Sequence, residues 1–324
     1  MTTTTTPVFV GIDVAKAKLD IGVRPGGEYW QCANDEAGMT EAVQRLGDRS
    51  PLLVVLEATG GREALAVRAL HAAGIPVAVV NPRQVRDFAR ATGKLAKTDK
   101  LDAGVLAHFA EAVRPEPQQP PDEATQRLGE GLARRRQLVG MLTAEKNRLE
   151  SAPAWLREEI AEHIAQLEKR LEDLSEGLQE AVAQNPEWRS KAEMLRGVPG
   201  VGPVLTLTLL AEMPELGKLN RKKIAALAGV APLARDSGKM RGKRSIWGGR
   251  APLRAALYMG CMSATRYNPA IQVMYERLRA AGKLPKVAYV ACMRKLLTVL
   301  NAMVRDGKPW DATLGMTAGA AEAA

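Results

Sequence analysis

The sequence predicts three structural regions: an α/β domain built on a mixed sheet, a long helical region, and a mainly α-helical domain. Three observations predict this order. Short apolar runs alternate with helical patterns across residues 8–114, apolar residues recur at spacings of three and four across 156–178, and helical patterns broken by glycine and proline fill 186–311. The chain of 324 residues is long enough for two or three domains.

The first region, residues 8–114, orders its strand and helix patterns in a way that indicates a topology. Aliphatic runs predict strands and amphipathic runs predict helices: strands at 8–12, 19–23, 52–56 and 77–80, a weaker strand at 29–32, and helices at 62–73, 82–91 and 99–113. The first strands are joined too closely for a crossover, so we expect an antiparallel meander. The later strands alternate with helices, which favours parallel pairing. A mixed sheet with an early meander is an RNase-H-like layout.

A proline-rich linker and a helical seam characterise the middle region, residues 115–185. The run RPEPQQPP at 114–121 predicts a stiff linker. Beyond a predicted break near Pro153, a heptad-like seam follows, flanked by Glu, Arg and Lys: Leu156, Ile160, Ile164, Leu167, Leu171, Leu174 and Leu178. Packing within the chain and an intermolecular coiled coil both explain this seam, and its length and narrowness favour dimerisation.

The C-terminal region, residues 186–311, begins with a turn rich in glycine and proline. The run LRGVPGVGP at 195–203 precedes an apolar helical stretch and looks like a helix-hairpin-helix turn. Free backbone N–H groups at a helix N-terminus suit a phosphate, so Gly200 and Gly202 are candidate nucleic-acid-binding residues. A plain turn between packed helices is the alternative. We expect amphipathic helices at 251–265 and 287–304, and disordered tails at 1–7 and 312–324.

The charge of the chain is distributed unevenly. There are 46 Lys and Arg residues against 36 Asp and Glu, a net charge of +10. Residues 186–324 alone hold 23 basic and 9 acidic side chains, and 11 basic residues lie between Lys218 and Arg254 with Asp236 as the one acid. Such clustering favours a polyanionic partner, and nucleic acid fits best. A membrane surface fits poorly because glycine and proline interrupt the stretch.

Other sequence features exclude several classes of protein. Cys32, Cys261 and Cys292 are far apart and form neither a zinc spacing nor a disulfide framework, which is consistent with a reducing cytoplasm. The three histidines are scattered and are expected to be structural or solvated. We find no apolar run of about 20 residues, no secretory leader pattern and no phosphate-binding loop of the Walker type. We therefore expect a cytoplasmic protein associated with DNA and not with membranes.

Acidic residues follow the predicted strands where a metal-dependent nuclease needs them. Asp13 and Glu57 end two buried apolar runs, and Asp99 and Asp102 share one face at the start of a predicted helix. Each alone is explained as a turn residue, a helix cap or a solvated helix face. Together they predict a site for Mg²⁺ or Mn²⁺, since carboxylate oxygens are the ligands these ions prefer. A pair of such ions stabilises both the attacking and the leaving oxygen of a phosphodiester.

Motifs in two separate regions resemble the IS110 family of bacterial transposases. In the first region they are GIDVAK at 11–16, LEATG at 56–60, NP at 81–82 and KTDKLDA at 97–103. In the last region they are GVPGVG at 197–202, LAGVAP at 227–232 and DSGK at 236–239. The resemblance runs from about Val8 to about Asp311 in the order of the family.

The resemblance implies a DNA recombinase that combines a RuvC-like metal site with a nucleophilic serine. The four acids of the family fall on Asp13, Glu57, Asp99 and Asp102, and its serine falls on Ser237. The implied partners are double-stranded DNA, at the element ends and the target, and a structured non-coding bridge RNA that pairs with both. Because recombination holds two duplexes and coordinates several cleavages, we expect a homo-oligomer, a dimer or a tetramer. Metal and serine lie far apart in sequence, so both domains must supply groups to one site, and we favour a site between subunits.

The residues around Ser237 suit that role. Asp236 and Gly238 flank it, and cations surround it in sequence: Arg235, Lys239, Arg241, Lys243 and Arg244. A serine hydroxyl needs activation, and nearby cations stabilise both an alkoxide and a scissile phosphate. Without the family match Ser237 would be taken for a turn serine. Ser245 and Ser263 are fallback candidates.

Three alternative functions remain open at this point. The GID run at 11–13 also resembles the phosphate loop of actin-like sugar kinases, but a second nucleotide-binding half is missing. A structure-selective nuclease resembling RuvC would use the acids without Ser237. A non-catalytic nucleic-acid-binding module would need neither, and the presence of all four acids and the serine argues against it. ATP turnover, junction cleavage by a Ser237 variant, and binding without strand exchange distinguish these alternatives.

Overall fold

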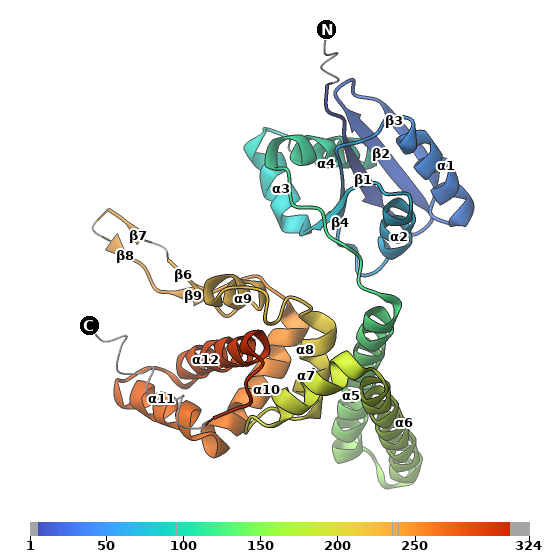
Figure 1. Cartoon of the computed structure of the whole chain (residues 1–324). Helices are drawn as coiled ribbons and strands as arrows, with labels where there is room; N and C mark the ends of the chain where they lie inside the picture. The colour runs from blue at the N-terminus through green and yellow to red at the C-terminus, as the bar shows by residue number, and fades with distance from the viewer. Residues whose placement is uncertain (1–5, 95, 97, 235, 239, 312–324) are drawn as a thin grey trace. The chain divides into compact units, whose positions relative to one another are not determined.

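The computed structural model describes residues 6–311 apart from 95, 97, 235 and 239 (Figure 1). It forms two compact units, with the boundary between Pro121 and Asp122. The expected tails lie outside the described residues except for positions 6 and 7. Each unit has its own core and is considered by itself.

The N-terminal unit is built on a mixed five-stranded sheet. Its elements are β1 (Phe9–Val14), β2 (Lys18–Arg24), β3 (Tyr29–Ala33), α1 (Glu36–Gly47), β4 (Leu53–Glu57), α2 (Ala64–Ala72), β5 (Val77–Val80), α3 (Pro82–Ala91) and α4 (Asp99–Val113). The strand order is β3-β2-β1-β4-β5. β1, β2 and β3 pair antiparallel, while β4 pairs parallel with β1 and β5. The predicted mixed sheet with an early meander is confirmed, and its order is that of an RNase-H-like sheet.

Helices cover both faces of this sheet (Figure 1). Even-numbered residues of β1, such as Val10 and Ile12, share a core with Met39 and Leu46 of α1 and with residues of α2. Phe9, on the opposite face, shares a core with residues of α3 and α4. Helix α1 was not predicted from the sequence. Its start at the Asp35 cap, where the carboxylate accepts from Gly38 N at 2.8 Å, was the available signal.

The closeness of α4 to the sheet depends on two paired glycines. Gly11 of β1 and Gly22 of β2 are register partners. A Cβ built on Gly11 would lie 2.2 Å from the backbone nitrogen of Ala107, and one on Gly22 would lie 2.9 Å from the carbonyl carbon of Ala103. The absence of side chains at these positions therefore lets the α4 backbone rest directly on β1 and β2. This contact fixes where the N-terminus of α4 lies.

The C-terminal unit is mainly helical. Its elements are α5 (Glu123–Ser151), the 3-10 turn η1 (Ala154–Leu156), α6 (Arg157–Gln184), α7 (Pro186–Arg196), α8 (Pro203–Glu212), α9 (Arg221–Leu227), β6 (Pro232–Leu233), β7 (Asp236–Ser237), β8 (Met240–Arg241), β9 (Ser245–Ile246), α10 (Ala251–Tyr267), α11 (Pro269–Ala280) and α12 (Pro285–Asp306). A core of apolar side chains joins α7 to α12. The predicted helices at 251–265 and 287–304 are confirmed within two residues, as α10 and α12. The short strands β6 to β9 were not expected.

The seam on α6 packs inside the chain. Ile160, Ile164, Leu167 and Leu178 are buried, and α6 makes its most extensive contact with α5. The first part of α5 and the last part of α6 share a small apolar core with α7 and α8. Within the chain, α5 thus covers the buried residues of this seam, and an intermolecular coiled coil stays a prediction. The periodicity identifies a buried helix face but not the helix that covers it.

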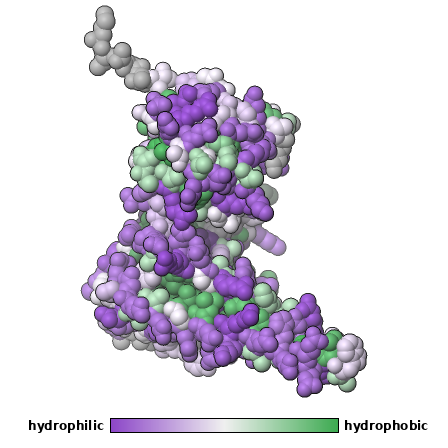
Figure 2. Space-filling view, turned by 90° about the vertical axis from the view of Figure 1, so that its right-hand side faces the viewer, coloured by the Kyte–Doolittle hydropathy of each residue, from purple (hydrophilic) through white to green (hydrophobic). Residues whose placement is uncertain are grey.

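Helix α12 is long and apolar enough to cross a membrane by length and composition alone. Its apolar residues, including Cys292, Leu296 and Leu300, instead lie in the core of the C-terminal unit. On the face drawn in Figure 2, hydrophilic side chains predominate, with smaller hydrophobic areas between them. This distribution is typical of a water-exposed surface.

Candidate active site and nucleic-acid interface

The predicted acids lie at one edge of the sheet in the N-terminal unit. Asp13 is the penultimate residue of β1, and Glu57 ends β4, one position beyond the register pair Ile12 and Leu56. Both therefore end adjacent parallel strands. Asp99 and Asp102 lie in the first turn of α4, where the partial positive charge of the helix N-terminus stabilises carboxylates.

The pKa of Asp13 shows that these carboxylates influence one another. Burial raises the pKa of Asp13, and the negative charges of Asp102, Asp20 and Asp99 raise it further. A hydrogen bond from the backbone of Val14 opposes these effects but does not cancel them. Gathered carboxylates repel one another unless a cation neutralises them. The acids thus form a strongly negative edge that favours a cation.

Asp20 is a fifth acid at this edge, and the sequence analysis did not single it out. It is the register partner of Asp13 and is fully buried. Burial raises the pKa of Asp20, but hydrogen bonds from Tyr29, Gln31 and Lys18 outweigh it and bring the pKa below its ordinary value. One carboxylate oxygen accepts from both the Tyr29 hydroxyl and the Gln31 amide. The available signal was an aspartate inside an otherwise apolar strand.

Lys18 places an ammonium group among the acids. Its Nζ lies 2.7 Å from Asp99 Oδ2 and 3.2 Å from Asp20 Oδ2. These two carboxylates raise the pKa of Lys18 above its ordinary value, so it is charged at neutral pH. Lys18 thus stands where a cation is favoured and bridges β2 to the start of α4.

The donor set fits a hard divalent cation, although the acids are not closed around one. Among the described residues, no three His, Cys, Asp or Glu side chains lie close enough to hold a metal ion. All the predicted ligands are carboxylates, which suits Mg²⁺ or Mn²⁺. Lys18 already acts as a stand-in cation on Asp99. A divalent cation at this site would be held by the four predicted carboxylates and would compete with Lys18 for Asp99.

Ser237 lies on an exposed hairpin of the C-terminal unit (Figure 1). β7 pairs with β8 through Asp236–Arg241 and Ser237–Met240, and β6 pairs with β9 nearer the body of the unit. Gly238, in the turn after Ser237, has a φ of +54°, a conformation that glycine adopts without strain. The hairpin therefore presents the Ser237 hydroxyl to solvent.

Asp236, next to Ser237, is held by a cation and is not free to act as a base. Arg244 donates two hydrogen bonds to the Asp236 carboxylate, at 2.6 and 2.8 Å, and Gly242 N donates a third at 3.1 Å. The Arg244 guanidinium lowers the pKa of Asp236 below its ordinary value. Arg241 and Lys243 are exposed on the same hairpin. The predicted contacts Arg235 and Lys239 lie outside the described residues.

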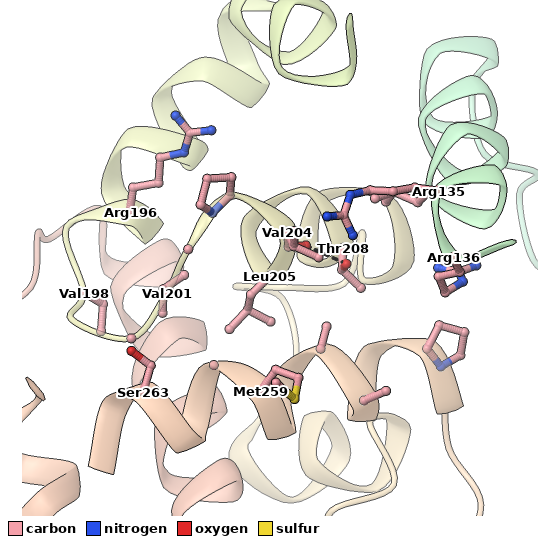
Figure 3. Close-up of a pocket in the computed structure, with 18 of the residues that line it drawn as sticks. Arg135, Arg136, Arg196, Val198, Val201, Val204, Leu205, Thr208, Met259 and Ser263 are labelled. Atoms are coloured by element: carbon pink, nitrogen blue, oxygen red, sulfur yellow. Dashed lines mark hydrogen bonds between the residues drawn. The ribbon is translucent and has the colours of Figure 1, made fainter. Parts of the chain in front are cut away.

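The predicted phosphate turn lines a cavity of about 720 Å³ in the C-terminal unit (Figure 3). Gly200 has a φ of +95°, and a Cβ there would lie 2.5 Å from that of Ala264, so the turn packs tightly on α10. Gly202 is the N-cap of α8 and provides no side-chain cap. Arginines from α5 and α7 line the cavity, together with apolar residues and Ser263 of α10. The fallback serines Ser245 and Ser263 lie on β9 and α10.

Each of these cavity arginines also has a partner in the protein. Arg196 donates to Gln179 at 3.0 Å, and Arg135 donates to Ser175 at 3.2 Å. Arg136 lies 3.4 Å from a Glu212 oxygen. The turn has the N-terminal geometry that suits a phosphate, but its arginines are already engaged. A helix-hairpin-helix role for Gly200 and Gly202 therefore stays a prediction.

Comparison with known proteins identifies the family. The DEDD transposase model of IS110 elements matches residues 10–152, and the transposase model of the IS116/IS110/IS902 family matches residues 192–276. A pilin gene-inverting protein of Moraxella lacunata is 30% identical over 315 residues, covering 94% of this chain and 97% of that protein. The chain belongs to the IS110 family of transposases.

Two further similarities cover parts of the transposase. An uncharacterized 42 kDa protein of insertion element IS900 from Mycobacterium paratuberculosis is 36% identical over 121 residues, which cover 36% of this chain and 30% of that protein. RuvC of Thermus thermophilus aligns with 34% of the transposase and 99% of its own chain, at 19% identity and a TM-score of 0.23. As a transposase of this family, the protein is a DNA recombinase and DNA is its partner.

Proposed function

We propose that this transposase cleaves and exchanges DNA strands through Ser237, with a divalent-metal site formed by Asp13, Glu57, Asp99 and Asp102. The observation that supports it most directly is the Asp13 carboxylate, half-buried at the sheet edge with the charges of Asp99 and Asp102 acting on it. Such a concentration of negative charge at one edge of the sheet is costly unless a cation is bound.

The acids have distinct roles in this proposal. Asp13 and Glu57, fixed at the ends of paired strands, give the site a rigid floor. Asp99 and Asp102, on the first turn of α4, would complete it if Asp99 exchanged Lys18 for the cation. A bound divalent cation would neutralise charge on the scissile phosphate. Lys18, once released, is free to contact the DNA backbone.

The serine step transfers a phosphoryl group between oxygens. Ser237 Oγ attacks the phosphorus of a phosphodiester, a P–O bond to a deoxyribose oxygen breaks, and the proton of the serine ends on that leaving oxygen. One strand end is then linked to phosphoserine and the other carries a free hydroxyl. Attack by the hydroxyl of a second strand reverses the step and joins the new pair of strands. The energy of the phosphodiester is conserved, so the exchange requires no nucleotide cofactor.

Guidance by a bridge RNA encoded in the element is the third part of the proposal. It rests on the resemblance of the motifs to the family and on the basic character of residues 186–324. The expected assembly is a homo-oligomer. Adding RNA transcribed from the non-coding segment of the element should make recombination specific to the DNA that this RNA pairs with. Equal recombination of unpaired targets without RNA would contradict guidance.

The serine is tested by trapping the enzyme on labelled DNA under denaturing conditions. Wild type should yield a covalent adduct, while Ser237→Ala should bind DNA but yield neither adduct nor exchange. Ser190→Ala, an exposed serine on α7, is the matched control and should keep both. Cleavage without an adduct, or recombination by Ser237→Ala, would show that water or another residue is the nucleophile.

The metal site is tested by separating metal binding from activity. Asp13→Asn should abolish strand cleavage and the rise in melting temperature caused by Mg²⁺, while the apo protein remains folded. Glu41→Gln, an exposed carboxylate on α1, is the matched control and should change neither property. Full cleavage in chelator would overturn the metal-dependent part of the proposal.

A further inference from the structure

A second cavity of the C-terminal unit, of about 1020 Å³, differs in character from the one at the glycine turn. It lies along α12 and is bounded by α9, α11 and the β6–β9 end of the hairpin. The cations among its lining residues are Arg221, Lys222, Arg244, Lys286, Arg294 and Lys295, and none of its lining residues is acidic. This groove therefore presents a purely positive wall to a ligand.

Three of these cations, Arg294, Lys295 and Lys286, have no partner among the described residues. Arg294 and Lys295 are half-buried on α12, yet no ion pair or hydrogen bond joins either side chain to a described residue. The Lys286 side chain is equally unpaired within the described chain. Elsewhere in this unit a half-buried cation is matched, as Arg250 is by Glu215 at 2.6 Å. Partly desolvated cations without an anion indicate that the anion comes from a ligand.

The floor of the groove is apolar. Met274, Val287, Val290 and Ile246 lie between the cations, and the Val287 side chain is 53% exposed. Duplex DNA presents phosphates outward and keeps the faces of its bases stacked inside. An unpaired strand presents phosphates and base faces together, and proteins bind it with basic grooves that also contact the bases. The combination of basic walls and apolar floor matches unpaired nucleotides.

The groove also continues into the hairpin that carries Ser237. Ser245 and Ile246 of β9 belong to its wall. Arg244 lines it too, and the same guanidinium binds Asp236, the neighbour of Ser237. A strand lying in the groove is thus directed along the hairpin toward the serine.

We propose that this groove binds an unpaired segment of the DNA strand next to the phosphodiester that Ser237 attacks. The choice of DNA over RNA rests on the proposed function of Ser237, since the strand nearest to the nucleophile is the one being cut. The groove supplies the grip on that strand, and the hairpin supplies the reacting hydroxyl.

The test measures binding of the full-length protein to three fluorescent probes of one sequence: single-stranded DNA, blunt duplex DNA and single-stranded RNA. The double variant Arg294→Gln/Lys295→Gln should weaken single-stranded DNA binding about tenfold and reduce the salt slope by about 1.4, since each lost phosphate contact removes about 0.7. Lys169→Gln/Arg170→Gln, two exposed neighbours on α6, is the matched control and should change neither value. Val287→Ser should weaken binding without changing the salt slope, because it alters the floor and not the charge.

Each other outcome overturns a stated part of the proposal. Unchanged single-stranded DNA binding in the Arg294 and Lys295 double variant excludes the groove as a nucleic-acid site. An equal loss for duplex excludes recognition of unpaired nucleotides, and a larger loss for RNA assigns the groove to RNA. Covalent trapping separates this result from the serine chemistry. If wild type forms no adduct while the groove variant still binds single-stranded DNA more weakly, the proposal for Ser237 is wrong and the proposal for the groove holds. If wild type forms an adduct while the groove variant binds DNA as wild type does, only the proposal for Ser237 holds.

Discussion

Replacing Gly11 with alanine should push α4 away from the sheet and so disturb the acid site without changing any acid. A Cβ at this position would lie 2.2 Å from Ala107 N and 2.4 Å from Ala103 O. Both are backbone atoms of a helix, so no side chain can rotate to make room. The helix itself must move by about 1 Å to restore an ordinary contact, and Asp99 and Asp102 move with it.

The size of the effect follows from the packing. Overpacking a close-packed interior costs about 3 kcal/mol where backbone must shift. In a unit of about 120 residues, 1 kcal/mol corresponds to roughly 4 °C in melting temperature, so Gly11→Ala should melt about 12 °C lower. Gly104→Ala is the matched control, because a Cβ there meets nothing within 4 Å. It lies inside α4 and should stabilise the helix by about 1 kcal/mol.

Differential scanning calorimetry of the full-length protein measures both changes, and DNA cleavage measures the site. Gly11→Ala should lower the transition of the N-terminal unit and also lose cleavage activity, while Gly104→Ala should keep activity. If Gly11→Ala melts within a degree or two of wild type, the close approach of α4 is not what positions the acids. If Gly11→Ala melts lower but cleaves DNA normally, the function of the acids does not depend on how closely α4 packs on the sheet.

Three further perturbations test other parts of the structure. Lys18→Met should enlarge the rise in melting temperature caused by Mg²⁺, because it removes the ammonium that competes for Asp99. Lys16→Met is the control and should leave this rise unchanged. A smaller rise in Lys18→Met than in wild type would contradict the prediction. Burial raises the pKa of Glu215, but hydrogen bonds from Arg250 bring it below its ordinary value of 4.5. The ionised Glu215 carboxylate therefore stabilises the folded state above pH 4.5, and this stabilisation is lost as the pH falls through the folded pKa. Glu215→Gln should be about 1.5 kcal/mol less stable than wild type at pH 7 and equally stable in acid. A difference in stability that does not change with pH would show another cause. Leu167→Glu should unfold the α5–α6 pair, because it buries a charge between the two helices, and proteolysis would detect the unfolding. If the variant is instead a folded monomer while wild type is an oligomer, the seam lies between chains.

The N-terminal fold could be predicted because its signals are local and strong. Buried strands read as aliphatic runs, and the Asp99 start of α4 follows Thr98, whose hydroxyl caps the helix at Leu101 N. The acids that end β1 and β4 were found for the same reason. Asp20 was not singled out because its burial and lowered pKa depend on tertiary contacts with Tyr29 and Gln31, which the sequence pattern does not show.

The C-terminal interface was predicted less completely because its parts depend on tertiary contacts. The hairpin around Ser237 has strands of two residues, mostly exposed, and these leave no alternating pattern to read. The groove joins α9, α11 and α12 with the hairpin, so its cations are dispersed in sequence. Charge density between Lys218 and Arg254 indicated a polyanion, but Arg294 and Lys295 lie outside that window.

The two proposed reactive parts of the transposase are built on opposite physical principles. Asp13 and Asp20 lie on strands of a close-packed sheet, against which α4 packs at Gly11 and Gly22. The core therefore determines their positions, and moving them is costly. Ser237 stands on an exposed hairpin with few buried contacts, and such segments open at low free energy. In the proposed function, a rigid metal site and an adjustable nucleophile suit strand exchange, because the serine would engage first one strand and then release it to another. The bidentate contact of Arg244 with Asp236 holds the residue next to Ser237, so a DNA phosphate that drew Arg244 away from Asp236 would couple strand binding to the position of Ser237.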